Sequence, residues 1–131
     1  MPSVMDDLVR WLGKQLDEDE RIARRVESSW RQIGETGVIV ASDGERAEEC
    51  ANGNWTGIAE HIVQHDPARV LREVEADRQL LATYTDAQAT IDALTHPDMY
   101  DVGRAQGLEE AVRHRALRLD GRAGYREEWR P

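Results

Sequence analysis

His61 and His65 stand four residues apart, and they are the pair in this chain whose type and spacing could do chemistry. On a helix this spacing places both imidazoles on one face, an arrangement that many zinc sites use. Further ligands could come from Cys50, Glu60, His96 and His114. The zinc-protease pattern is missing because Ile62 follows His61, and a single cysteine cannot form a CxxC pair. We therefore favour exposed or helix-capping histidines and keep zinc binding as the alternative.

Four consecutive acidic residues, from Asp17 to Glu20, suggest a metal site at first sight. Consecutive side chains on a helix point about 100° apart, so these carboxylates cannot converge on one ion. Arg21 and Arg24 follow Asp17 and Glu20 by four residues, the favourable arrangement for ion pairs along a solvated face. The chain also lacks a glycine-rich phosphate loop and a nucleophile elbow. We predict no catalytic residue, and the missing machinery favours a non-enzymatic protein.

Length and charge limit the classes of protein further. A chain of 131 residues is about one domain, which we place at residues 1–131. The net charge of −9 argues against direct nucleic-acid binding, since such binding depends on Lys and Arg. The absence of a long apolar run and of a signal-peptide pattern predicts a cytoplasmic protein with no membrane contact. Residues 104–131 carry +2 and residues 1–103 carry −11, so the basic end could dock on the acidic body of its own or another copy.

Apolar periodicity predicts several amphipathic helices. Ser3 and Asp6 resemble a capping box that opens a helix to about Val26. Asp66 can cap a second long helix, with Pro67 at its first position and its end near Leu94. A shorter helix is expected between Ile58 and His65. Residues 95–98 form a stop followed by a fresh cap at Asp98, and the last helix is expected from about Asp98 to Leu119.

A small sheet is expected between the first helix and the histidines. The segment Gly37–Ala41 contains three consecutive β-branched residues, which are typical of a strand, and Asp43-Gly44 fits a two-residue hairpin turn. The returning segment, from Arg46 to about Cys50, is poor in apolar residues and could be strand or helix. The fold class predicted is α+β, mainly α, with about four amphipathic helices around one core and a small antiparallel hairpin or meander near residues 30–50.

The aromatic residues point to contacts with a partner. The chain has four tryptophans and no phenylalanine, and Trp is favoured at protein interfaces. We predict that the residues that bind a partner are Trp11, Trp55, Tyr125 and Trp129. A tryptophan so close to the end also predicts that the tail packs on the body of the protein or on a partner, since free termini are disordered by default.

Three segments resemble an uncharacterised family of small actinobacterial and actinophage proteins, a domain of unknown function. They are DDLVRWLGKQLDEDERIAR from Asp6, HIVQHDPARVLREVEA from His61, and YREEWRP from Tyr125, with Trp30 between the first two. The HDPARVL and EWRP pieces are the most specific, whereas residues 94–124 depart from the family's pattern. The resemblance implies a cytoplasmic bacterial or phage setting. It brings no known activity and no catalytic residue.

The sequence therefore predicts a non-enzymatic protein–protein interaction module that self-associates, with a second copy of itself in a homodimer as the expected partner. Two alternatives belong to other classes. One is a metal-dependent hydrolase or nucleotide-processing enzyme that uses His61 and His65. The other is an acidic, phage-type antagonist that imitates DNA before a nucleic-acid enzyme.

Overall fold

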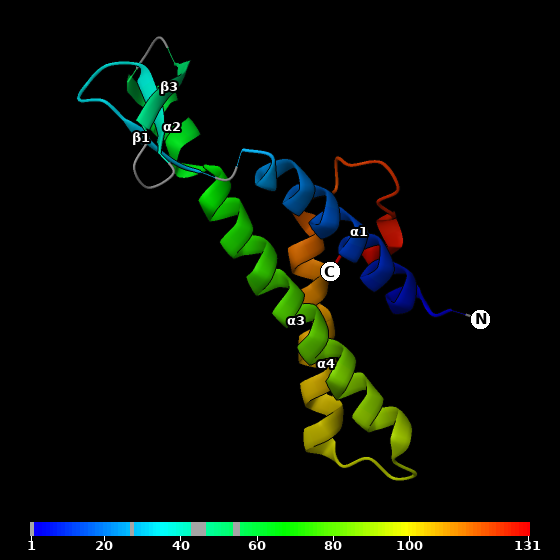
Figure 1. The fold of residues 1–131 in the computed structure, drawn as a ribbon. Helices are drawn as coiled ribbons and strands as arrows, with labels where there is room; N and C mark the ends of the chain where they lie inside the picture. Colours follow the sequence, from blue (N-terminus) through cyan, green and yellow to red (C-terminus); the bar gives the residue numbers. More distant parts are fainter. Residues whose placement is uncertain (1, 27, 43–46, 54–55) are drawn as a thin grey trace. The chain divides into compact units, whose positions relative to one another are not determined.

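The computed structural model describes residues 2–26, 28–42, 47–53 and 56–131 (Figure 1). Its elements are, in chain order, α1 (Val4–Arg24), β1 (Ser29–Gln32), β2 (Val38–Ser42), β3 (Ala47–Asn52), α2 (Thr56–Gln64), α3 (Pro67–Ala93), α4 (Met99–Leu117) and the short 3-10 helix η1 (Glu127–Trp129). The prediction of a mainly helical chain with a small antiparallel sheet is confirmed. Among the described residues, no helix has both the length and the apolar character needed to cross a membrane.

The chain forms two compact units, which corrects the expectation of about four helices around one core. The helical unit combines residues 1–17 with residues 75–131, and the sheet unit comprises residues 18–74. Three helices, α1, α3 and α4, are long, whereas α2 has nine residues and belongs to the sheet unit. Periodicity along one segment cannot reveal which neighbour a helix packs against, and this is why the count around a single core was wrong.

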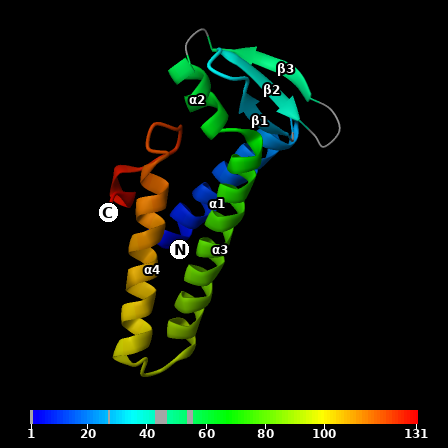
Figure 2. The same ribbon diagram turned by 90° about the vertical axis from the view of Figure 1, so that its left-hand side faces the viewer.

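In the helical unit, α3 and α4 run side by side as an antiparallel hairpin, which both views show (Figures 1 and 2). Leu8, Leu12 and Leu16 lie four residues apart on α1, and each is 2% exposed or less. This spacing gives one apolar stripe along the helix. The buried residues that α3 and α4 contribute to the same unit are Leu81, Tyr84, Ala87, Ala105, Val112 and Ala116.

Asp77 connects α3 to α4 inside the helical unit. Its carboxylate is almost fully buried and accepts hydrogen bonds from two guanidinium groups, that of Arg115 on α4 at 2.8 Å and that of Arg118 just past the end of α4 at 2.5 Å. A carboxylate can be buried only when such donors replace its water. Asp77 therefore fixes the register of the two helices.

The sheet unit contains an antiparallel meander in the order β1-β2-β3. The register shifts between Ile39 and Val40, so that β3 carries one extra residue there. Ile39 on β2 and Ala59 on α2 are fully buried, and a Cβ at Gly53 would lie 2.9 Å from the backbone nitrogen of Ala59. The segment that could have been strand or helix is strand β3. The predicted Asp43-Gly44 turn lies outside the described residues.

Three helix starts use the side chains that the sequence indicated. Ser3 and Asp6 exchange backbone-to-side-chain hydrogen bonds of 3.0 Å, which is a capping box. Asp98 caps α4 by accepting from the amide of Asp101. Asp66 caps α3 through the amide of Arg69 and accepts a second bond, 2.9 Å long, from the amide of Trp30 at the start of β1. Asp66 thus holds the first strand against the start of α3.

The ion pairs on α1 differ in part from the predicted ones. Arg24 pairs with Glu20 as expected. Arg21 instead binds Glu18, three residues earlier, at 2.6 Å. Asp17 pairs at 2.8 Å with Arg78 of α3, within the helical unit.

Candidate interaction surface

The predicted aromatic residues Trp11, Tyr125 and Trp129 come together in the helical unit, and we call them the aromatic cluster. Ring centroids are 5.7 Å apart for Trp11 and Tyr125, 5.3 Å for Trp11 and Trp129, and 5.7 Å for Tyr125 and Trp129. Trp129 is 1% exposed, and its indole N–H and the hydroxyl of Tyr125 are enclosed with no hydrogen-bond partner among the described residues. The C-terminal tail therefore packs on the body of its own chain.

Polar contacts hold the backbone around the cluster. Trp11 donates its indole N–H to the carbonyl oxygen of Ala123, 3.1 Å away. Gly124 adopts a φ of +89°, and a Cβ there would lie 2.8 Å from the Trp11 nitrogen. Only glycine combines this backbone conformation with such a close approach. The chain thus needs Gly124 to turn Tyr125 back toward α1.

Arginines of the tail surround the same cluster. Arg126 lies over the ring of Trp129, with 5.3 Å to its centroid, and forms an ion pair with Asp7 of α1 at 3.1 Å. Arg130 lies over Tyr125 and binds both Glu127 and Asp120. The hydrogen bond from Arg130 lowers the pKa of the Glu127 carboxyl below its ordinary value. The Arg126–Asp7 pair is thus a contact within one chain between the basic end and the acidic body that the sequence distinguished.

A role of these residues in binding a partner stays a prediction. Trp129 is enclosed by its own chain, so a partner could reach it only after the tail detaches. Trp11 and Tyr125 are partly exposed at the edge of the cluster. Trp55 lies outside the described residues.

His61 and His65 share one face of α2 and its end, with ring centroids 4.5 Å apart. The Nδ1 atom of His65 lies 2.8 Å from the carbonyl oxygen of His61. Nδ1 is therefore in contact with the backbone, and Nε2 takes no part in this contact. Within the described residues, no group of three or more His, Cys, Asp or Glu side chains is placed to hold a metal ion. Cys50 is exposed, and the partial loss of solvent around its thiol raises the thiol pKa above the ordinary value. Zinc binding by the two histidines stays a prediction.

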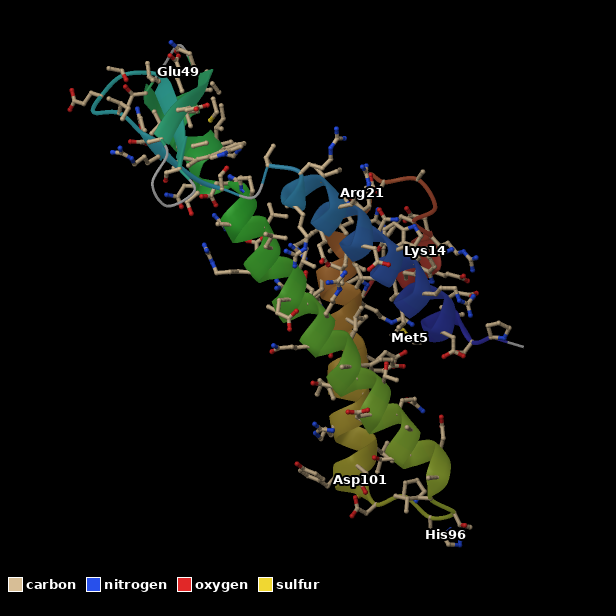
Figure 3. All side chains as sticks on the ribbon, in the orientation of Figure 1. Met5, Lys14, Arg21, Glu49, His96 and Asp101 are labelled. Atoms are coloured by element: carbon tan, nitrogen blue, oxygen red, sulfur yellow. The ribbon has the colours of Figure 1, made fainter. Side chains whose placement is uncertain are left out.

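A second surface of the helical unit was missed by sequence reasoning. Met99 is 91% exposed and Tyr100 is 74% exposed, in the first turn of α4. Leu94, just past the end of α3, is 44% exposed. We call these three residues the hairpin-tip patch. Figure 3 marks the same end of the α3–α4 hairpin by His96 and Asp101. The sequence did contain a signal for this surface. Two large apolar residues, Met99 and Tyr100, directly follow the helix cap at Asp98.

A small groove lies beside the hairpin-tip patch. It has a volume of about 210 Å³ and is lined by Ala87 and Thr90 of α3 and by Tyr100, Asp101 and Arg104 of α4. The end of the hairpin therefore combines a protruding apolar group, a hollow and charges of both signs. Such a surface is suited to binding a protein.

Comparison with known proteins gives a family and no activity. Residues 5–131 match the model of a family described as "Family of unknown function (DUF6221)". No curated protein and no solved structure matches the chain. The match includes both the helical and the sheet unit. The chain therefore belongs to this family of unknown function.

Proposed function

We propose that this protein is a non-enzymatic interaction module that self-associates through its hairpin-tip patch. The observation that carries the proposal is the exposure of Met99 and Tyr100, neighbours that leave 91% and 74% of their surface in water. Burial of apolar surface contributes roughly 25 cal/mol per Å². Adjacent exposed apolar groups of this size mark a surface that gains free energy from a partner.

A second copy fits this surface because the protruding and the hollow parts lie side by side. In a two-fold dimer, each copy presents the same surface to the other. The protruding residues of each copy can therefore enter the groove of the other copy. The groove carries Asp101 and Arg104, which have opposite charges. An antiparallel arrangement can place each Arg104 beside the Asp101 of the second copy, and this complementarity favours a dimer over a random apolar contact.

The size of the patch predicts a weak dimer. Three side chains of this kind expose on the order of 400 Å² of apolar surface in each copy. Stable complexes bury about 800 Å² on each partner. We therefore expect a dissociation constant in the micromolar to millimolar range, and a monomer in dilute solution.

Sedimentation equilibrium over a wide concentration range tests the proposal. Wild type should shift from monomer to dimer as concentration rises, and the double variant Met99→Ser, Tyr100→Ser should remain monomeric with unchanged helical circular dichroism. The control is Ile22→Ser, which removes an apolar residue that is 54% exposed on the other unit and should leave the dimer intact. A wild type that stays monomeric throughout, or a double variant that dimerises as wild type does, would contradict the proposal.

The alternatives from the sequence stay predictions of other classes. A hydrolase that uses His61 and His65 would need further ligands or reactive groups, and within the described residues the two rings contact each other and the backbone. A DNA imitation would need carboxylates in rows. Several carboxylates of α1 and the tail are engaged instead with arginines, for example in the pairs Glu18–Arg21 and Asp7–Arg126. These contacts weigh against the two alternatives.

A further inference from the structure

Two grooves of the helical unit meet at the N-terminal end of α1, which Figure 3 marks by Met5. Their volumes are about 540 and about 440 Å³. Four residues line both grooves and so mark the junction: Asp6 of α1 and Tyr84, Gln88 and Asp92 of α3. All four carry oxygen acceptors, so the junction is a place where a hydrogen-bond donor can be received.

Tyr84 is the residue that distinguishes this junction from an ordinary acidic surface. Its side chain is more than nine-tenths buried, yet its hydroxyl forms no hydrogen bond among the described residues. Among the described residues, the enclosed side-chain atoms without a partner are the Tyr125 hydroxyl and the Trp129 indole N–H, so the Tyr84 hydroxyl is accessible, and Tyr84 lines both grooves. A hydroxyl on a mostly buried side chain that lines a groove can exchange its contact with solvent for a hydrogen bond to a ligand.

Charge around the hydroxyl favours a cation. Burial raises the pKa of the Tyr84 hydroxyl, and the carboxylates of Glu109, Asp6 and Asp92 raise it further, while Arg113 acts in the opposite direction. Arg113 is already engaged with Glu109 and with the carbonyl oxygen of Glu128. Asp6 accepts from the amide of Ser3 through one oxygen, and Asp92 accepts from Gln88 through one oxygen. Each of these two carboxylates therefore keeps an oxygen for a ligand.

The residues that line the grooves indicate which class of cation can bind there. Within the described residues, no three or more His, Cys, Asp or Glu side chains are grouped to hold a metal ion, whereas an organic ammonium group can be bound by fewer carboxylates together with a hydroxyl. An alkylammonium group has three N–H donors, which matches Asp6, Asp92 and the hydroxyl of Tyr84. Beyond the junction, the larger groove is lined by Pro2, Val9, Arg10, Thr85 and Ala89. Pro2, Val9 and Ala89 offer an apolar wall to a hydrocarbon chain, and the charge of Arg10 is paired with Asp7 at 3.4 Å.

We propose that this junction binds a small primary alkylamine, with its ammonium group between Asp6, Asp92 and the Tyr84 hydroxyl and its chain along the apolar arm of the larger groove. The site lies on other residues than the hairpin-tip patch. It is therefore independent of self-association.

Titration of the full chain with n-pentylammonium, followed by two-dimensional NMR, tests the site. Amide shifts near Tyr84 and Asp92 should saturate, whereas n-pentanol, which has the same chain without the charge, should cause no saturable shift. Tyr84→Phe removes only the hydroxyl and Asp92→Asn only the charge. Each should weaken binding about fivefold to tenfold. Asp86→Asn makes the same charge change on the same helix outside both grooves and should leave binding within about twofold.

Three outcomes would overturn the proposal. They are the lack of any saturable shift with the amine, binding of n-pentanol as tight as that of the amine, and equal weakening by Asp86→Asn and Asp92→Asn. Asp92 is exposed, so its variant keeps the test valid even if Tyr84→Phe disturbs folding.

Discussion

At the scale of single residues, Asp77 shows how one buried charge is made tolerable. Its side chain is 4% exposed, whereas the side chains of Arg115 and Arg118 are 41% and 42% exposed. The two sides of this contact are therefore unequal. The carboxylate depends on the guanidinium groups to replace its water, while each guanidinium can return to solvent.

This inequality predicts an asymmetry between variants. Asp77→Ala should lower the free energy of unfolding by about 1–3 kcal/mol, because the freed arginines are hydrated. The double variant Arg115→Ala, Arg118→Ala should cost more, about 3–5 kcal/mol, because it leaves a buried carboxylate without donors. Urea unfolding of both, with the exposed pair Arg69–Glu73 broken by Glu73→Ala as control, measures the difference. Equal costs for the two variants would show that the carboxylate is hydrated rather than held by the arginines.

At the scale of elements, helix ends decide where each segment starts and how it responds to acid. The amide and hydroxyl of Ser3 bond to Asp6, and the amide bond, the larger effect, lowers the pKa of the Asp6 carboxyl below its ordinary value of 3.8. The folded state therefore prefers the ionised form of Asp6. The resulting stabilisation is present at neutral pH and disappears as the pH falls through the lowered pKa.

Asp6→Asn should therefore lessen the response to acid. Between about pH 5 and about pH 2, the thermal midpoint of the variant should fall less than that of wild type, since it has no Asp6 charge to lose. Asp86→Asn, which removes a charge from α3 away from this cap, should follow wild type. Melting curves monitored by circular dichroism give the comparison. A parallel fall in Asp6→Asn and wild type would mean that the cap does not contribute to acid sensitivity.

The packing of the C-terminal tail depends strongly on one residue, Trp129. Trp129→Ala should lower the free energy of unfolding by about 3–5 kcal/mol, since it empties the centre of the aromatic cluster. Trp129→Phe keeps an aromatic ring and removes the unpartnered indole N–H, so it should cost clearly less. Denaturant unfolding measures both, and hydrogen exchange at residues 120–131 shows whether the tail is released. A tail that stays protected in Trp129→Ala would mean that the arginine contacts alone hold it.

At the scale of the whole molecule, the elements that could be predicted from the sequence are those whose bounds depend on neighbouring residues in the chain. Periodic apolar residues and the caps at Asp66 and Asp98 predicted α3 and α4 to within a few residues of their observed bounds. β3 was ambiguous because five of its six side chains are exposed, so it carries little alternation. The pairing with β2 makes it a strand.

Properties that depend on which elements meet could not be predicted from one chain. The division into a helical and a sheet unit follows from long-range packing. The aromatic residues were expected to be partner contacts, yet Trp129 is enclosed by its own helix neighbours. The sequence predicted the start of the last helix near Met99 but gave this residue no role. Its 91% exposure follows from the packing of α3 and α4, which leaves the first turn of α4 uncovered.

Cross-linking of cysteines introduced at the hairpin tip tests most directly whether two copies pair there. In a Cys50→Ser background, a single cysteine is introduced at His96, which is exposed beside the hairpin-tip patch, and a short bismaleimide is added at a concentration where wild type sediments as a dimer. We expect a covalent dimer joined at residue 96 in both copies, identified by mass spectrometry, and little product from a control cysteine at Ile22. Equal yields from the two positions, or no covalent dimer from position 96, would contradict the account.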